Sequence, residues 1–324
     1  MNSSTGIAPV TAFQTWIDYV YEDMADYGAN YTNNTYQFDI GDWKTLATLI
    51  SVSTMIAMAI GFIGVVLNLS VLVVIIKERS FHTTTNYFIF NLALADTCYM
   101  FRCIIHAALL ATNLLPMTCS GWTSYVQYVC CQASCNTLLA LSLSRYDAIV
   151  HPLQSLRRWN KERVKIAVAV SWAVAFILQL PSYFLQCTPT SLLSKLQHIY
   201  VYAVMFPLPA LLLAGCYARI TSAALRNGQS LPRNNKTKIP CDKQKLTRMV
   251  TMILLTFFIC WGPLSTFLLY KFLDGWNSTH WISDRIWLFS LTLLSQLAGI
   301  INPCIYAFCG KQFLRYFPEI CRRR

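Results

Sequence analysis

The sequence contains few charged residues. Asp, Glu, Lys and Arg together make up 12% of its 324 residues, whereas apolar residues make up 55%. A soluble globular chain has roughly twice that charged share, so this chain cannot hide its apolar surface in a water-soluble fold and lipid must cover part of it. Its thirteen cysteines lie mostly inside long apolar runs, which excludes a secreted scaffold held together by many disulfides.

A signal peptide is also lacking, because no apolar core of about 7–15 residues follows a basic start within residues 1–40. The first membrane helix is therefore expected to anchor the chain. A bacterial-type transmembrane β-barrel is excluded, since its strands would be alternating segments of about ten residues. Neither an internal repeat nor a polar pore is visible, which disfavours a transporter or a channel.

Long runs without charge are present instead. Six of them hold between 22 and 42 residues, and a membrane-spanning helix needs roughly 20 mostly apolar residues. One further apolar stretch is interrupted by Asp96 and Arg102. The expected fold class is an all-α membrane protein with a bundle of seven transmembrane helices. These helices are expected at 46–76, 83–111, 119–150, 164–186, 198–226, 245–272 and 282–308.

The basic residues predict the orientation of this bundle. With the N-terminus outside the cell, 21 Lys and Arg residues fall on the inner side and 5 on the outer side, as the positive-inside rule requires. Acidic residues show the opposite bias, with eight outside and five inside. The net charge of +12 is then a consequence of topology and gives no reason to expect a nucleic-acid partner. We expect a multi-pass plasma-membrane protein with an extracellular N-terminus.

The expected outer segments contain candidate modification sites. Asn-x-Ser/Thr motifs, where N-glycosylation occurs, lie at Asn2, Asn30, Asn33 and Asn277. Cys119 and Cys187 lie at the outer ends of the third and fourth expected helices. They are either free thiols that pack as small apolar side chains or a disulfide, which persists in an oxidising compartment. Their positions on separate helices favour the disulfide.

Ionisable and helix-breaking residues interrupt the expected spans. Asp96 lies mid-span, where a charge is costly and is a functional hypothesis by default. Its carboxyl is expected either to be neutral and hydrogen-bonded to Asn68 or Ser134, or to belong to a hydrated, ion-binding switch. Prolines, which kink helices, occur within spans at Pro181, Pro207, Pro209, Pro263 and Pro303. Together these residues indicate a bundle that can shift between two packings.

Taken in order, these landmarks resemble the rhodopsin-like (class A) G-protein-coupled receptors over about residues 50–320. Each motif alone is weak, but they fall in register on seven expected spans. The matching residues are Asn68, Asn91 to Asp96, Ser144 to Tyr146, Trp172, Pro209, Tyr217, Cys260 to Pro263 and Asn302 to Tyr306. Phe308 and Phe313 match the short amphipathic eighth helix of that family.

The resemblance implies a receptor, not an enzyme, and roles for particular residues. Gln127, Trp261 and Gln296 would line the ligand pocket, with Trp261 as the toggle beneath the ligand. A pocket for water and a sodium ion, the one candidate cofactor, would be framed by Asp96, Ser134 and Asn302. The residues expected to act at the inner face, where a heterotrimeric G protein would dock, are Ser144, Arg145, Tyr146, Tyr217, Pro303 and Tyr306.

Two departures from the family pattern bear on this function. Ser144 replaces the acidic residue that usually holds the arginine by a charge-assisted hydrogen bond, so we expect raised ligand-free signalling. Asp147 is expected to substitute poorly, because residues two apart on a helix face different directions. Ala298 and Gly299 stand where the family usually has polar sodium-pocket side chains, which weakens the expectation of sodium.

A peptide is the expected ligand. Gln296 occupies the position of the opsin lysine, and Gln127 that of the aspartate of amine receptors, so retinal and small amines are disfavoured. Residues 142–153 resemble vasopressin/oxytocin, neuropeptide S and crustacean cardioactive peptide receptors, whereas later segments resemble melanin-concentrating hormone and somatostatin receptors. The alternatives are a scavenging receptor of the same fold with weak G-protein coupling, and a receptor for a non-peptide small molecule.

The expected domains are an extracellular glycosylated tail at 1–44, a receptor domain at 45–309, and a cytoplasmic eighth helix and tail at 310–324. The first tail holds six acidic residues between positions 18 and 42, which suit either a disordered segment or an arm that attracts a basic peptide. Cys321, beside three arginines at the end of the chain, is a candidate palmitoylation site, with a free thiol as the alternative.

Overall fold

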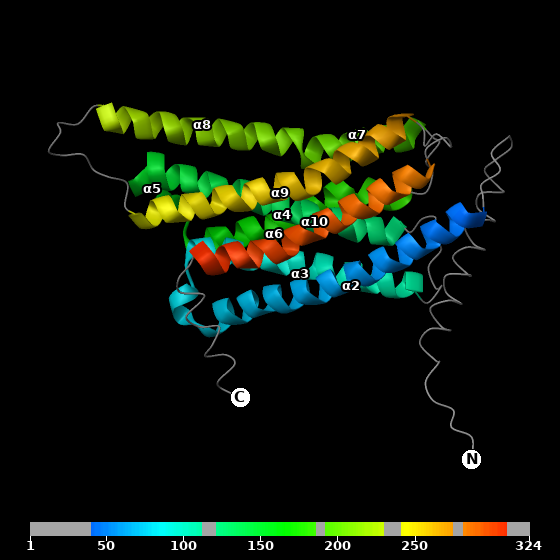
Figure 1. The fold of residues 1–324 in the computed structure, drawn as a ribbon. Coiled ribbons are helices and arrows are strands. Elements are labelled where there is room, and N and C mark those ends of the chain that lie inside the picture. The colour runs from blue at the N-terminus through cyan, green and yellow to red at the C-terminus, as the bar shows by residue number, and fades with distance from the viewer. Residues whose placement is uncertain (1–39, 112–120, 186–191, 230–240, 275–280, 310–324) are drawn as a thin grey trace, which may run out of the picture.

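The computed structural model describes residues 40–111, 121–185, 192–229, 241–274 and 281–309. All regular elements within these ranges are helices (Figure 1). They are α2 (Ile40–Lys77), the short 3-10 helix η1 (Arg79–Phe81), α3 (Thr84–Ala111), α4 (Gly121–Val150), α5 (Pro152–Arg158), α6 (Lys161–Leu185), α7 (Leu192–Met205), α8 (Pro207–Gln229), α9 (Cys241–Asp274) and α10 (Trp281–Cys309).

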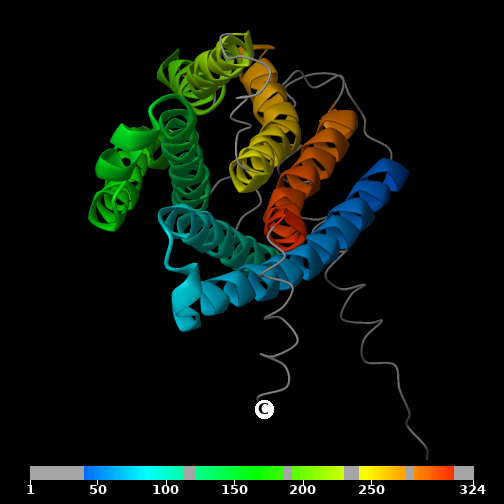
Figure 2. The ribbon, with the colours of Figure 1, turned by 90° about the vertical axis from the view of Figure 1, so that its left-hand side faces the viewer.

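The long helices lie side by side and alternate in direction, which forms a bundle (Figures 1 and 2). Because α7 and α8 follow one another along a single pass, the described helices cross the bundle seven times. We call the end where α4 begins the Gly121 end, and the opposite end the Arg145 end. At 1.5 Å per residue the helix from Gly121 to Arg145 is about 36 Å long, which is enough to cross the hydrocarbon core of a bilayer.

The outside of the bundle is apolar. Large side chains such as Val66, Ile177 and Leu211 are 62%, 71% and 71% exposed, which water would penalise and lipid would not. Six stretches of the described helices are long and apolar enough to span a membrane: Thr48–Lys77, Thr84–Leu109, Lys161–Phe184, Lys195–Cys216, Lys245–Lys271 and Ser283–Phe308. The expectation of an all-α membrane fold is confirmed.

Helix α4 is the pass that is not among these six, and its position explains why. It packs against α3, α6 and α8 as its main neighbours and lies within the bundle (Figure 2). Of its 30 residues, 15 are buried, including Gln132, Ser134, Thr137, Ser142 and Asp147. A helix enclosed by other helices does not have to be apolar toward lipid, so its polar side chains face protein partners.

The fifth pass differs from the sequence-based expectation of one helix at 198–226. It consists of α7 and α8, which meet at Phe206. Proline has no backbone N–H, so Pro207 and Pro209 cannot donate to the carbonyls one turn earlier. The neighbouring bonds persist, with Phe206 N donating to the Tyr202 carbonyl at 3.0 Å and Ala210 N to the Phe206 carbonyl at 2.9 Å. The two prolines therefore divide the pass without ending it.

Helices α2, α3 and α10 approach one another closely around Met100. This side chain is fully buried and lies between two glycines, Gly64 of α2 and Gly299 of α10. A Cβ atom at Gly64 would lie 2.9 Å from Met100 Cγ, and one at Gly299 would collide with Met100 Cε. Small residues let membrane helices pack at short distance, and here both glycines make room for one methionine.

We expect Gly299→Val to destabilise the bundle, because the added side chain enters space that Met100 already fills. Overpacking of this kind costs about 1–3 kcal/mol and should lower the thermal unfolding midpoint of the purified protein in detergent. Gly215→Val is the matched control, since nothing lies within 4 Å of a Cβ atom at Gly215. Equal midpoints for the two variants would contradict the close packing described here.

Candidate functional site

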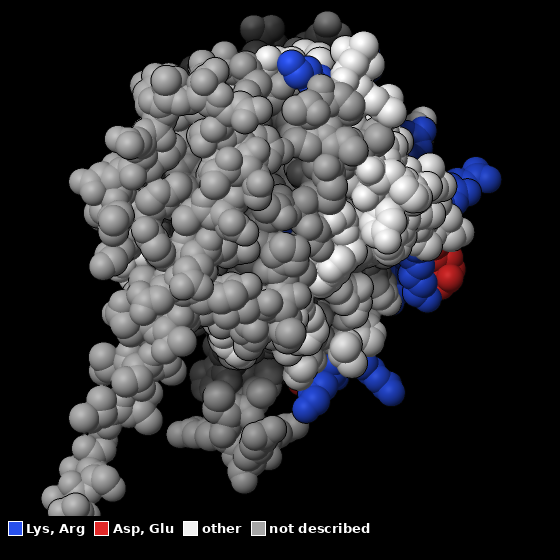
Figure 3. All heavy atoms as spheres, turned by 90° about the vertical axis from the view of Figure 1, so that its right-hand side faces the viewer, with Lys and Arg blue, Asp and Glu red and all other residues white. Residues whose placement is uncertain are grey.

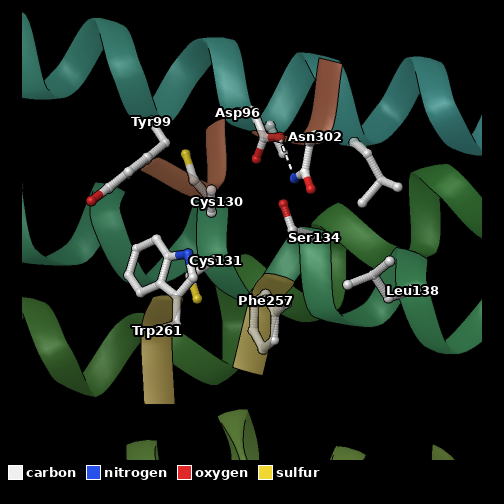
Figure 4. A pocket seen from close by; sticks show the side chains of 12 residues that line it. Asp96, Tyr99, Cys130, Cys131, Ser134, Leu138, Phe257, Trp261 and Asn302 are labelled. Atoms are coloured by element: carbon white, nitrogen blue, oxygen red, sulfur yellow. Dashed lines mark hydrogen bonds between the residues drawn. The ribbon is translucent and has the colours of Figure 1, made fainter. Parts of the chain in front are cut away.

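A small cavity lies in the middle of the bundle, between α3, α4, α9 and α10 (Figure 4). Its volume is about 20 Å³, which is room for a single water molecule or an ion of similar size. It contains the three residues expected at the sodium and water pocket. Its walls are formed by Leu92, Ala95, Asp96, Tyr99, Cys130, Cys131, Ser134, Leu138, Phe257, Trp261, Ala298 and Asn302.

Asp96 is hydrogen-bonded inside this cavity. Asn302 Nδ2 donates to Asp96 Oδ2 at 2.9 Å, and Ser134 points toward both residues from α4 (Figure 4). The Oδ1 atom of Asn302 is buried and has no hydrogen-bond partner. The cavity thus brings together a carboxyl group, a hydroxyl and an unsatisfied amide oxygen. Such oxygen atoms are the ligands that hard metal cations bind.

One partner expected for Asp96, the side chain of Asn68, is not observed beside it. Asn68 does not bond to Asp96, because its Nδ2 donates to the Gly64 carbonyl at 2.8 Å and to the Gly299 carbonyl at 2.7 Å. The carbonyl of Gly299 is within reach of Asn68 because α2 and α10 approach each other closely at this point. Asn68 therefore ties α2 to α10, and the amide of Asn302 takes the place beside Asp96.

Trp261 forms the cavity wall nearest the Gly121 end. Its ring packs against that of Tyr99, with centroids 4.9 Å apart, and the Tyr99 hydroxyl lies 3.2 Å from Ser295 Oγ. Of the three expected ligand-pocket residues, Trp261 alone lines this cavity. Gln296 is buried in α10, with an Oε1 atom that has no partner, and Gln127 is half-buried on α4.

At the Arg145 end, the contacts of the arginine guanidinium within the described residues include two hydroxyl groups. Arg145 Nη2 donates to Thr85 Oγ1 of α3 at 2.7 Å, and Arg145 Nε lies 3.4 Å from Ser144 Oγ. The Ser144 hydroxyl itself donates to the Leu141 carbonyl at 2.7 Å. Ser144 is therefore a distant, weak acceptor, and the shorter of these two bonds goes to a threonine.

Asp147 has partners of its own. Its carboxylate forms an ion pair with Arg158 at 2.9 Å and accepts a hydrogen bond from Trp159 Nε1 at 2.8 Å. Both partners come from the segment that includes α5, so Asp147 fastens that segment to α4. These partners agree with the expectation that Asp147 substitutes poorly for the missing acidic neighbour of Arg145. Tyr146 turns to a different neighbour, the ring of His151, at a centroid distance of 6.0 Å.

The remaining expected switch residues lie on α8 and α10. Tyr306 is fully buried, and its hydroxyl has no hydrogen-bond partner. Pro303 lies within α10, where it removes one backbone hydrogen bond. Tyr217 lies on α8, with a side chain outside the described part. A buried hydroxyl without a partner is costly, so Tyr306 is poised to gain a bond if the helices rearrange.

Three helices are joined by a polar network around Asn91. Trp172 Nε1 of α6 donates to Asn91 Oδ1 at 2.7 Å. Asn91 Nδ2 in turn donates to Thr137 Oγ1 of α4 at 2.7 Å. Asn91 is fully buried, so each of its bonds is made within protein. The network holds α3, α4 and α6 in fixed register near the Arg145 end.

Comparison with known proteins agrees with these features. The family model described as 7 transmembrane receptor (rhodopsin family) matches residues 67–306, which is well over half of the chain. The chain belongs to the rhodopsin family of seven-transmembrane receptors. It is a G-protein-coupled receptor and not an enzyme.

The chain is also similar to individual named receptors. The KiSS-1 receptor of Mus musculus is 28% identical over 291 residues, covering 80% of this chain and 72% of the relative. The galanin receptor type 2 of Mus musculus is 26% identical over 301 residues, covering 87% and 78%. The allatostatin-A receptor of Bombyx mori is 26% identical over 287 residues, covering 81% and 77%.

Several expected sites of the receptor lie outside the described residues. These are the candidate disulfide of Cys119 with Cys187, the candidate glycosylation sites Asn2, Asn30, Asn33 and Asn277, the eighth helix with Phe313, and Cys321. Within the described residues, no group of three or more His, Cys, Asp or Glu side chains is arranged to hold a metal ion.

Three residues of the receptor's interior were not singled out by motif. Thr85 is one of three consecutive threonines at 83–85, and no sequence pattern marks which of them reaches Arg145. Tyr99 becomes notable only through its contact with Trp261. Arg102 does carry a signal, because an arginine within an apolar stretch is unusual, but the predicted topology places it among the charges of the outer segments. The structure places it in α3 with 8% exposure.

We expect Trp172→Phe to destabilise the receptor by removing the indole N–H that satisfies Asn91. The buried Asn91 Oδ1 atom would lose its partner, which costs about 1–3 kcal/mol. Thermal unfolding in detergent measures the loss. Trp287→Phe is the control on α10, because that tryptophan is 59% exposed. A midpoint drop of the same size in both variants would show that the Asn91 bond adds nothing.

Proposed function

We propose that this receptor lies in the plasma membrane with the Gly121 end outside the cell, binds an extracellular neuropeptide or peptide hormone there, and activates a heterotrimeric G protein at the Arg145 end. The observation that carries the proposal is the family match together with peptide-receptor relatives over some 80% of the chain. The charge asymmetry of the sequence supports the orientation. In Figure 3, which faces the Gly121 end, the visible Lys and Arg side chains lie at the edge of the described surface.

The interior geometry suits a transmembrane signal. Trp261 and Tyr99 lie between the Gly121 end and the cavity at Asp96, and the cavity lies between them and the Arg145 end. Asn302 belongs to the same helix as Tyr306, one turn apart. A ligand that shifts Trp261 would therefore move side chains that border the cavity, and through α10 the residues at the Arg145 end. Such a coupling requires two packings of the helices, which the prolines within α6, α9 and α10 favour.

The cavity is a fitting place for one sodium ion. Asp96 supplies the charge, and Ser134 and the unsatisfied Asn302 Oδ1 supply two further oxygens. When bound, the ion would neutralise Asp96 and hold the cavity closed. Ala298 forms part of the wall and offers only a methyl group, so the protein contributes fewer oxygen ligands than a fully polar pocket would.

A screen tests the peptide proposal directly. Cells that express the full chain are exposed to neuropeptides, each made as a free acid and as an amide, with calcium and cAMP as readouts. We expect at least one peptide to raise a signal that an Arg145→Gln variant with the same surface level does not transmit. Peptide uptake without any signal would favour a scavenging receptor, and a response to small amines alone would contradict the peptide proposal.

The hydroxyl contacts of Arg145 predict the ligand-free activity. Ser144→Asp should lower basal signalling, because a carboxylate beside Arg145 forms a charge-assisted bond. Thr85→Val should raise it, because the 2.7 Å bond from Arg145 is lost. A neutral bond is worth about 1 kcal/mol, which corresponds to a change of about fivefold in a two-state equilibrium.

Basal G-protein activation at matched surface levels measures both effects. Thr97→Val is the control on α3, since its hydroxyl bonds only within the helix, to the Ala93 carbonyl at 2.7 Å. It should leave basal activity unchanged. If the parent, Ser144→Asp and Thr85→Val signal equally without ligand, these contacts do not hold the resting state.

A further inference from the structure

A buried cation lies between the cavity and the Gly121 end. Arg102 of α3 is 8% exposed and lies six residues beyond Asp96, which is about 9 Å farther along the helix. Arginine remains charged at any physiological pH. A buried charge is costly unless it is paired, so the contacts of this guanidinium decide what it does.

Those contacts are neutral and few. Arg102 Nε donates to the Thr123 carbonyl of α4 at 3.1 Å, and Nη1 lies 3.7 Å from the thiol of Cys103. A guanidinium has five N–H donors, and the Nη2 group bonds to none of the described residues. Arg102 also forms no ion pair with any carboxylate of the described residues. The bond to Thr123 accounts for one donor and leaves the charge unbalanced.

A second buried cation near this end, among the described residues, is paired. Lys271 of α9 and Asp284 of α10 are both buried, with Nζ 2.7 Å from Oδ2. This fold can therefore supply a carboxylate to a buried cation at a helix interface. At Arg102 it supplies only a carbonyl and a thiol.

Further unsatisfied groups lie on the neighbouring surfaces. His106, one turn beyond Arg102 on the same face of α3, has a buried Nδ1 atom without a partner. Gln296 of α10, whose Oε1 is also unpartnered, lies beside the thiol of Cys103. The acceptor of the Arg102 bond, Thr123, is one turn from Gln127 on α4. The unsatisfied groups thus come from α3 and α10. The Arg102 guanidinium needs an anionic acceptor, and the side-chain carbonyl oxygen of Gln296 needs an N–H donor.

We propose that Arg102 is an anion subsite of the ligand pocket and receives a carboxylate of the agonist. This rests on the proposed function of a peptide receptor. The guanidinium binds a carboxylate through two parallel N–H bonds, which supplies the missing counter-charge. In a peptide the carboxylate is either the free C-terminus or an Asp or Glu side chain. Backbone N–H groups beside it suit an acceptor such as Gln296 Oε1.

A binding assay without an agonist tests the subsite. The full chain is purified in detergent, and its thermal unfolding midpoint is measured with 3-phenylpropionate or 3-phenylpropionamide, which differ only in the charge of the head group. The acid should raise the midpoint of the parent by binding the folded state, and the amide should not. Arg102→Gln, which keeps a hydrogen-bond donor but no charge, should lose the response to the acid. Arg102→Lys should retain part of it.

Lys195→Gln on α7 is the matched control, since it removes a half-buried cation elsewhere near this end and should respond as the parent does. Equal shifts with acid and amide, or an undiminished shift in Arg102→Gln, would overturn the subsite. If Arg102→Gln does not yield folded protein, the acid and amide are compared on the parent and Arg102→Lys, and an equal response to both probes in the parent overturns it in the same way.

The peptide screen separates this proposal from the proposed function. With an active peptide in hand, Arg102→Gln should reduce the potency of the form that carries the relevant carboxylate by about tenfold or more. Comparing free acid with amide, and Asp or Glu with Asn or Gln, identifies the source. A peptide equally potent on the parent and Arg102→Gln overturns the subsite and leaves the receptor function intact. An Arg102-dependent acid response with no active peptide overturns only the peptide function.

Discussion

The bundle depends on the enclosure of α4, the pass that is too polar to face lipid. Inside a membrane no water is available to satisfy a polar group, so each such side chain has to find a partner within the protein. Residues outside α4 supply these partners: Asn91 for Thr137, Thr85 for Arg145, and Trp159 for Asp147. The need to satisfy one helix thereby determines which faces of α3 and α6 point inward.

The same constraint makes the exceptions informative. Asn302 Oδ1 and the Tyr306 hydroxyl are buried without partners, and Arg102 lacks a described counter-ion. Buried groups without partners cost free energy. These three lie on α3 and α10, between the two ends of the bundle. A receptor has to change packing when ligand or G protein binds. Groups that can gain bonds in another arrangement reduce the cost of that change, which is a physical reason for a resting state that is not fully satisfied.

Much of this architecture could be predicted from residue order alone. Apolar runs, all but one of them free of charge, predict the ends of the spans to within six residues, because a helix that faces lipid has to be apolar over a bilayer thickness. The structure differs from these predictions where several hydrogen-bonding groups compete for the same partner. The sequence marks Pro207 and Pro209 as helix-breaking residues. That the fifth pass divides at Phe206 depends on the combined loss of the two backbone N–H donors, which the sequence does not show. The family resemblance groups Asp96 with Ser134 and Asn302, but the residues alone offer Asn68 or Ser134 as partners of its carboxyl, and they do not indicate that the amide of Asn302 reaches it from 206 residues away.

The sequence by itself determined the class of molecule, since the number of apolar runs, their lengths and their flanking charges follow from composition. It also determined that Arg145 would have a hydroxyl neighbour, because Ser144 is adjacent in the chain. Only the tertiary structure decided which groups meet across helices. Asn68 donates to the Gly299 carbonyl because Met100 fits between two glycines and lets α2 and α10 approach. Asp147 forms an ion pair with Arg158. Arg102 donates to the Thr123 carbonyl inside the bundle. These pairings depend on the rotation and depth of each helix, which packing of the whole bundle sets and no local pattern records.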